Sequence, residues 1–192
     1  DGRHWRGPGS TGYAAPSALP PTWSATNNVA WQVPLQGSGV SSPIVFGNRV
    51  FVTSQAGDGR RRAGNHPTLT QGGDPASAGE RTLAKRSRAG VAFIVEAFDR
   101  ASGKRLWIHE VAPVGDLPPV HDKHNLASAS PVTDGERVYA WFGTGQLVAL
   151  DANGKPVWSK HLGREYGAFE INWGHACSPE LFEVSIILLC YH

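Results

Sequence analysis

The sequence predicts an all-β protein, a β-propeller built from four-stranded antiparallel blades, and two repeated units predict it. A hairpin unit that begins with Ser-Pro covers residues 41–52, returns at 129–140, and returns more weakly at 177–188. A second hairpin unit, with Asp, Gly, Lys and Trp in corresponding places, covers 95–111 and 147–162. Two hairpins in succession give four antiparallel strands, and a repeated unit of this size is typical of propellers.

The first unit is predicted to be a hairpin because of its turn and its flanking residues. SSPIVFGNRVFV, ASPVTDGERVYA and CSPELFEVSIIL each place an apolar run, two turn residues and a second apolar run after Ser-Pro. The apolar runs are short and rich in Val, Ile and Phe, which favour strands. The 23 glycines and 14 prolines of the chain supply many turns.

The second unit carries a turn built on Asp and Gly, followed by a Trp on the outgoing strand. Asp bonds to its own nearby backbone and Gly tolerates a positive φ, so both residue types favour tight turns. The repeated positions are Asp99, Gly103 and Trp107 in the first copy and Asp151, Gly154 and Trp158 in the second.

The spacing of the repeats indicates an insertion. Pro131 and Pro179 are 48 residues apart, whereas Pro43 and Pro131 are 88 apart; propeller blades repeat at ~40–50 residues. Most of the excess falls in residues 57–90, which carry seven Lys and Arg against three Asp and Glu, a charge of +4. We predict a solvated loop between the second and third strands of the first blade, with binding to an anionic surface or a partner protein as the alternatives.

We predict a single partial propeller domain over residues 1–192. Its parts are an extended N-terminal segment (1–27), a strand that closes the last blade and carries Trp31 (28–36), blade 1 (41–111), blade 2 (126–162) and the start of blade 3 (176–192). Unpaired strand edges at the two ends of such a piece would favour pairing with other chains.

Charge and hydropathy exclude two classes of function. Eighteen Lys and Arg against sixteen Asp and Glu leave +2, too little for nucleic-acid binding by the whole chain. No apolar run approaches the ~18 residues of a membrane helix. The chain begins at Asp1 and contains no methionine, so we expect an upstream segment, such as a cleaved signal peptide. Two cysteines fit an exported protein without a disulfide framework, and we predict a periplasmic or extracellular location.

The second unit resembles the repeat of the pyrroloquinoline-quinone (PQQ) type propellers. AFDRASGKRLW and ALDANGKPVW are the two copies that carry this resemblance. WRGPGSTG at 5–12, NVAWQVPLQGSGVSSPIVFGNRVFV and SPVTDGERVYAWFGTGQLVALD are also similar to PQQ-binding-like propellers. The resemblance implies eight blades in the intact protein and places Trp31, Trp107 and Trp158 between neighbouring blades, as packing residues.

The resemblance implies two functional classes. One is a quinoprotein alcohol or sugar dehydrogenase, which holds PQQ and Ca²⁺ in its central funnel and often has a disulfide between adjacent cysteines. The other is a non-catalytic propeller, such as the outer-membrane assembly lipoprotein that binds partner proteins. Adjacent cysteines are absent here. We therefore favour an exported binding or scaffold module without catalysis, whose partner is a protein or a cell-envelope component; PQQ with Ca²⁺ in the full-length protein is the alternative.

Several aromatic and imidazole side chains are candidates for a binding site at the funnel or rim, because they lie off the repeat position or just before an inner strand. They are His121, His124, Asn125, Trp141, Trp173, His175 and His192. Convergence of His121, His124 and His175 would suit Zn²⁺ and a metal-dependent hydrolase. The alternative is that such histidines bond to loop carbonyls and that these tryptophans pack in the core.

The two cysteines are predicted to be neighbours. If Glu183 and Val184 form a two-residue turn, facing residues of the third Ser-Pro hairpin have numbers that sum to 367, as Cys177 and Cys190 do. They then form a non-hydrogen-bonded pair with Cα atoms ~4.5 Å apart, at the short end of disulfide geometry. A disulfide and two free thiols are both compatible with this register.

Overall fold

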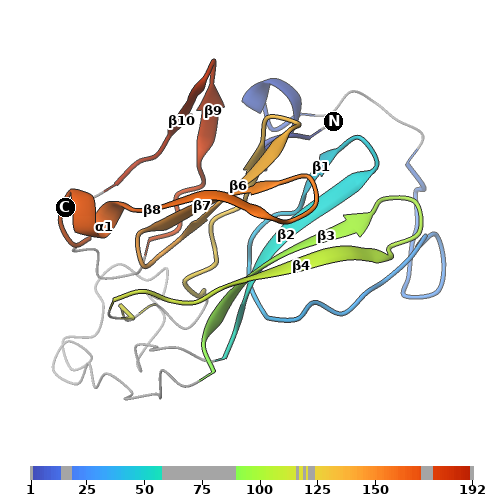
Figure 1. Cartoon of the computed structure of the whole chain (residues 1–192). Coiled ribbons are helices and arrows are strands. Elements are labelled where there is room, and N and C mark those ends of the chain that lie inside the picture. The colour runs from blue at the N-terminus through green and yellow to red at the C-terminus, as the bar shows by residue number, and fades with distance from the viewer. Residues whose placement is uncertain are drawn as a thin grey trace, which may run out of the picture.

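The computed structural model describes residues 2–13, 19–57, 90–115, 117–118, 120, 124–169 and 175–190. Within these ranges the chain forms two four-stranded antiparallel sheets and a two-stranded hairpin, in that order along the sequence (Figure 1). Helix in the described part is limited to a 3-10 turn, Pro8–Ser10, and the short helix α1, Leu162–Glu165. The predicted all-β fold of four-stranded antiparallel blades is confirmed.

The first sheet corresponds to blade 1, and its strands follow the chain in the order β1-β2-β3-β4. These strands are β1 (Ile44–Phe46), β2 (Arg49–Ala56), β3 (Ala92–Asp99) and β4 (Arg105–Val111). The basic segment therefore falls between β2 and β3. Residues 58–89 lie outside the described part of the chain, so the nature of this loop stays a prediction.

The second sheet repeats this order as β5-β6-β7-β8. Its strands are β5 (Val132–Thr133), β6 (Arg137–Phe142), β7 (Gln146–Asp151) and β8 (Pro156–His161). Pairing of β6 with β7 joins the Ser-Pro hairpin to the Asp-Gly-Lys-Trp hairpin in one sheet. The two units are thus successive halves of one blade.

The third repeat forms a hairpin of β9 (Glu180–Phe182) and β10 (Ser185–Ile187). Its facing pairs are Phe182 with Ser185, Leu181 with Ile186 and Glu180 with Ile187. This is the register expected from the sequence. Glu183 occupies the first turn position with φ 52°, the left-handed region that the corresponding Gly47 reaches without strain.

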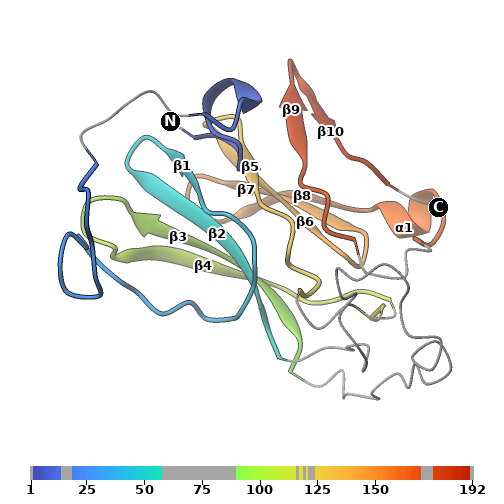
Figure 2. The ribbon, with the colours of Figure 1, turned by 180° about the vertical axis from the view of Figure 1, so that it is seen from behind.

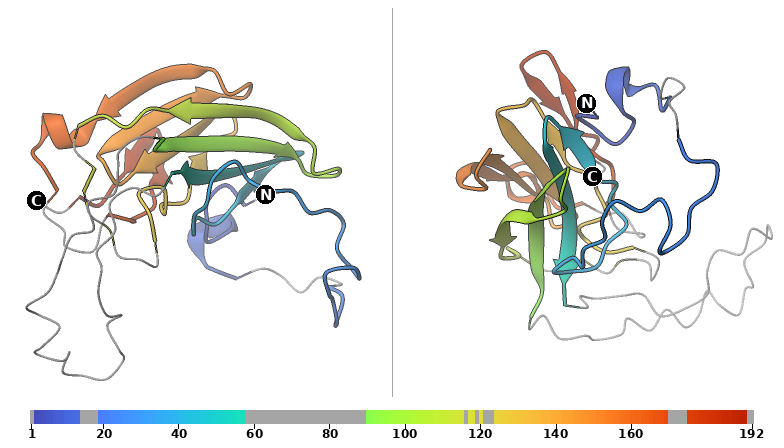
Figure 3. Two further views of the ribbon diagram at one scale, coloured as in Figure 1. Left: turned by 90° about the horizontal axis from the view of Figure 1, so that it is seen from below. Right: turned by 90° about the vertical axis from the view of Figure 1, so that its right-hand side faces the viewer.

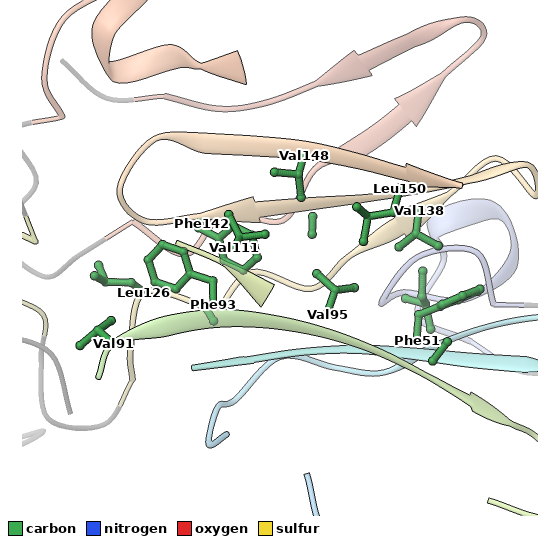
Figure 4. Close-up of a cluster of buried hydrophobic side chains, with 14 of the residues drawn as sticks. Phe51, Val91, Phe93, Val95, Val111, Leu126, Val138, Phe142, Val148 and Leu150 are labelled. Carbon is green, nitrogen blue, oxygen red and sulfur yellow. The ribbon is translucent and has the colours of Figure 1, made fainter. Parts of the chain in front are cut away.

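The main apolar core lies between the two four-stranded sheets, which face each other (Figure 3). Figure 4 shows side chains of β3 pointing toward those of β6 and β7. Phe93 and Phe142 stack at the centre, with ring centroids 4.5 Å apart and planes 9° from parallel. Burial of such alternate side chains on both sheets is the main stabilising contribution to the pairing of blades.

Trp107 of β4 reaches across to the turn of the next blade. Its indole Nε1 donates to the carbonyl of Ala152 at 3.0 Å, and its ring covers Gly154. A Cβ at Gly154 would lie 2.5 Å from the ring atom Cδ2, and the φ there is 79°. Glycine recurs at this position because the turn needs a positive φ and the tryptophan fills the space of a side chain.

Trp31 makes the same contact with blade 1. Its Nε1 donates to the carbonyl of Arg100 at 2.8 Å, and a Cβ at Gly103 would lie 2.6 Å from its ring. Trp31 is thus placed relative to blade 1 as Trp107 is relative to blade 2. Residues 28–36 pair with no strand here, and their place in a closing blade stays a prediction.

Glu96 and Arg105 form an ion pair on the face of blade 1 that contacts residues 34–36. The Glu96 carboxylate is fully buried, and its Oε1 lies 2.8 Å from Nε of Arg105. Its Oε2 accepts a hydrogen bond from the Gln36 backbone at 3.1 Å, and Arg105 also donates to the carbonyl of Pro34 at 3.2 Å. Arg105 therefore connects the chain before β1 to the sheet.

The serine of the Ser-Pro unit links successive blades. The Ser42 backbone N–H donates to Oγ of Ser130 at 2.8 Å, and the Ser130 N–H donates to Oγ of Ser178 at 2.9 Å. Each blade thus donates to the hydroxyl at the corresponding position of the next. This contact gives the repeated serine a structural role.

Candidate functional site

The three sheets approach one another at their first strands. β5 contacts both β1 and β9, and Figure 2 shows these three strands near the N-terminal segment. We call the free edges of β1, β5 and β9 the inner edges, and residues 2–10 the axial segment. In a propeller the first strand of each blade lies nearest the axis, so the inner edges form the wall of its centre.

The axial segment bonds to the inner edges through its backbone. The Val45 N–H in β1 donates to the carbonyl of Gly2 at 2.9 Å, and the Thr133 N–H in β5 donates to the carbonyl of Arg3 at 3.0 Å. Val45 and Thr133 are corresponding residues of their Ser-Pro units. Two consecutive carbonyls therefore each accept one hydrogen bond from the edges of two consecutive blades, and the bridge between Gly2 and Val45 is antiparallel, as in β-strand addition.

Side chains of the axial segment extend this contact to the third repeat. Ser10 donates its hydroxyl to Oε1 of Glu180 in β9 at 2.6 Å. Nε2 of His4 lies 3.9 Å from the same oxygen. The Arg3 guanidinium lies 4.7 Å from the ring centroid of Phe46, within range of a cation–π interaction. Residues 2–10 thus contact the first strand of all three repeats.

In the turn after β5, both carboxylate oxygens of Asp134 accept hydrogen bonds, close to where Arg3 bonds to Thr133. Oδ2 of Asp134 accepts from the Tyr139 hydroxyl at 2.6 Å, and Oδ1 accepts from the N–H groups of Glu136 and Arg137 at 2.8 and 2.7 Å. Partial burial by itself would raise the pKa of Asp134, but these hydrogen bonds outweigh it and lower the pKa below its usual value. The carboxylate therefore shapes the turn and is a poor proton acceptor.

Because the pKa of Asp134 is lowered in the folded state, we expect its contribution to stability to depend on pH. Ionised Asp134 stabilises the folded state above its unfolded pKa of about 3.9, and that contribution is lost as the pH falls through the lower folded pKa. We expect Asp134→Asn to lower the melting temperature at pH 7 and the difference from the parent protein to shrink toward pH 3. Thermal melts of both proteins across this range test it; a difference independent of pH would contradict it.

Two of the predicted rim residues are buried and serve the fold. The side chain of Asn125 donates from Nδ2 to the carbonyl of Ser38 at 2.7 Å and accepts at Oδ1 from the Ala127 N–H at 2.9 Å. Trp141 is fully buried, and its Nε1 donates to Nδ1 of His175 at 3.4 Å. Both residues connect loops to the core of the described chain.

The predicted histidines are only partly placed. His175 is buried beside Trp141 and Phe169, with ring centroids 5.6 and 5.2 Å away. His124 is half-buried, and its Nδ1 lies 3.2 Å from the carbonyl of Asn125. His121, Trp173 and His192 lie outside the described residues. Among the residues that are described, no three His, Cys, Asp or Glu side chains form a group that could hold a metal ion, so that site stays a prediction.

The remaining repeat residues make contacts within their turns or with the next repeat, and both cysteines are unbridged. Asp99 and Asp151 accept hydrogen bonds from the backbone of their own turns. Trp158 packs against Tyr139, with ring centroids 5.8 Å apart, and faces the third repeat. Cys177 and Cys190 are both free thiols in this structure.

Sequence reasoning did not find the axial contact. Arg3, His4 and Ser10 belong to no repeat position, and the bonds to Val45 and Thr133 join backbone atoms, which carry no sequence signal. The available signal was the segment WRGPGSTG, whose three glycines all adopt a positive φ. These turns reverse the chain between Arg3 and Ser10, so that both ends of the axial segment reach the inner edges.

Part of the chain matches a known protein family. Residues 91–176 match the protein-family model described as outer membrane protein assembly factor BamB. Similar solved structures include BamB from Moraxella catarrhalis (TM-score 0.45, 15% identity, 84% of this chain and 34% of that chain). Another is quinohemoprotein alcohol dehydrogenase from Comamonas testosteroni (TM-score 0.44, 14% identity, 78% of this chain and 17% of that chain). No curated protein matches the sequence.

The stacked four-stranded antiparallel sheets are those of a β-propeller, and this chain forms part of one. The match over residues 91–176, which include both Asp-Gly-Lys-Trp hairpins, supports the predicted resemblance to the PQQ-repeat family. The chain spans about a third of the BamB structure and about a sixth of the dehydrogenase structure. No helix in the described part of the chain is long and apolar enough to span a membrane.

Proposed function

We propose that this protein is an exported, non-catalytic propeller that acts as a binding or scaffold module in the cell envelope, and that its inner edges bind an extended polypeptide segment. The observation that carries the proposal is the pair of backbone bonds from Val45 and Thr133 to Gly2 and Arg3. Edge N–H groups that donate to the carbonyls of one peptide are suited to donate to another peptide of the same shape.

Two further points support a protein partner. The matched family is described as an assembly factor of the outer membrane, a role that involves other proteins of the envelope. The bonds at the inner edges involve backbone atoms, so they fix the path of the bound segment for any sequence. Selection of a particular sequence then depends on neighbouring side chains. Arg3 on Phe46 and Ser10 on Glu180 are such side-chain contacts here.

We assign no PQQ and Ca²⁺ site to the described residues. Asn125 and Asp134 carry side-chain oxygens of the type that Ca²⁺ prefers, but these oxygens already accept hydrogen bonds within the chain. No reaction step is therefore assigned to the described part of the chain. A quinoprotein dehydrogenase is the competing function, and the experiment must distinguish the two.

The first test is binding of the axial segment in trans. A labelled peptide GRHWRGPGSTG, the sequence of residues 2–12, is titrated against the full-length protein and against a variant that lacks these residues, with fluorescence anisotropy as readout. We expect saturable binding to the truncated variant and little to the parent protein, whose inner edges are occupied. Equal binding to both, or none to a folded truncated variant, would contradict the proposal.

Val45→Pro provides a sharper variant for the same assay. Val45 is one position from the closing pair of its hairpin, Phe46 and Arg49, so its N–H points away from β2 and proline removes only the bond to Gly2. Loss of one backbone hydrogen bond of about 1 kcal/mol predicts roughly fivefold weaker peptide binding in the truncated background. Val45→Ala keeps the N–H and is the matched control, for which we expect unchanged affinity.

The competing function is tested on the full-length protein with PQQ and Ca²⁺. We expect no alcohol-dependent or sugar-dependent dye reduction after these cofactors are added. Saturable PQQ uptake, seen by absorbance, together with substrate-dependent turnover would overturn the scaffold proposal.

A further inference from the structure

The two cysteines of the chain flank the hairpin of the third repeat. The register of β9 and β10 pairs Glu180 with Ile187. Three further steps outward from this pair, beyond the ends of β9 and β10, lead to Cys177 and Cys190. The intervening pairs keep the same sum of residue numbers, so the two cysteines face each other if the strands continue in register.

The pairing type at this position suits a disulfide. The two-residue turn makes Phe182 and Ser185 the closing hydrogen-bonded pair, and the pair type then alternates outward. Cys177 and Cys190 fall on a non-hydrogen-bonded pair, where Cα atoms approach to about 4.5 Å, within the range that disulfides bridge. Pro179 falls on the preceding non-hydrogen-bonded pair, where its missing N–H leaves no ladder bond unmade.

Packing shows that the alternation continues to Cys190. Ile186, Leu188 and Cys190 all pack against one cluster of buried residues that contains Trp141. Side chains two apart lie on one face of an extended strand, so residues 188–190 keep the extended course of β10. Burial raises the pKa of Cys190, and the nearby Cys177 raises it further, as expected for two neighbouring sulfur atoms.

We propose that Cys177 and Cys190 are a redox pair that forms an intramolecular disulfide when the protein meets a disulfide oxidant. A thiolate of one cysteine attacks the oxidant's S–S bond and releases one thiol. The second cysteine then attacks the resulting mixed disulfide and releases the other thiol. The two protein thiols lose two electrons and two protons, and the oxidant, a protein or small-molecule disulfide, is reduced to two thiols.

The disulfide would fix the hairpin that supplies Glu180. It closes a loop over residues 177–190 around β9 and β10, and Glu180 is the residue that accepts the Ser10 hydroxyl. Oxidation therefore stabilises the strand edge on which the axial segment makes its third contact. The inference stands on the register and packing of the hairpin and does not depend on the proposed function.

The test is oxidation of the full-length protein by oxidised glutathione under native conditions. We expect these two thiols to be lost from a thiol titration, the protein mass to fall by two hydrogen atoms, and a proteolytic peptide to link Cys177 to Cys190. Dithiothreitol restores both thiols. Hydrogen exchange of residues 180–187 slows on the order of 10-fold in the oxidised form, since the closed loop restricts local opening.

Cys177→Ser is the matched control, in which Cys190 keeps a titratable thiol and exchange is insensitive to the oxidant. Two outcomes overturn the proposal. One is that both thiols of the parent protein persist after oxidant treatment that oxidises a dithiol peptide of the same spacing. The other is that Cys177 or Cys190 is linked to a different cysteine or to a second chain.

Discussion

Replacing Gly154 by alanine is expected to destabilise the contact between blades 1 and 2 by about 3 kcal/mol. Two costs add at this position. The φ of 79° is unfavourable for any residue with a Cβ, and the new Cβ would lie 2.5 Å from Cδ2 of Trp107. Trp107 would have to move, and its bond to the Ala152 carbonyl would be lost. Urea denaturation of the full-length protein gives the difference in free energy of unfolding.

Gly47→Ala is the matched control for this substitution. Gly47 also has a positive φ, 57°, but among the described residues other than its chain neighbours no atom lies within 4 Å of where its Cβ would be. We expect about 1 kcal/mol of destabilisation from backbone strain alone. Gly103→Ala, which would bring a Cβ within 2.6 Å of Trp31, should resemble Gly154→Ala. If all three variants lost the same stability, the tryptophan contact would contribute nothing.

The second large effect is expected from Arg105→Leu. Removing the guanidinium leaves the fully buried Glu96 carboxylate with one hydrogen bond, from the Gln36 N–H. An uncompensated buried charge costs about 3–5 kcal/mol. We expect the lower end of this range, about 3 kcal/mol, because the Arg105 side chain is 38% exposed and water can reach the site. Urea denaturation again measures the loss.

The double variant Glu96→Val with Arg105→Leu is expected to recover most of this loss. In blade 2 the corresponding positions hold Val148 and Pro156, so the fold accepts an apolar residue where Glu96 lies. Replacing a buried ion pair by packed apolar groups is often neutral or stabilising. A double variant as unstable as Arg105→Leu would show that the loss comes from the contact between Arg105 and Pro34.

The inner edges suggest how the ends of the repeats are protected. A free strand edge presents unpaired N–H and C=O groups and favours pairing with other chains. In this chain Gly2 and Arg3 occupy the edges of β1 and β5. Displacement of residues 2–10 would expose these edges to the partner segment proposed above.

The local elements of this protein could be predicted from its residues alone. The Ser-Pro and Asp-Gly-Lys-Trp units specified the hairpins, because their turn residues and apolar runs act over only a few positions. The same local reasoning predicted the register of β9 and β10, which follows from the length of one turn. The repeat then indicated that the two hairpins form one sheet.

The tertiary structure alone decided which residues meet across the blades. Asn125 and Trp141 were candidates for a funnel or rim site, and packing against distant loops buries both side chains. The axial segment contacts residues more than 40 positions away, and it does so mainly through backbone atoms that every residue type carries. A sequence pattern records side chains and short-range turns, so a contact made by the common backbone over a long separation becomes visible only in the folded chain.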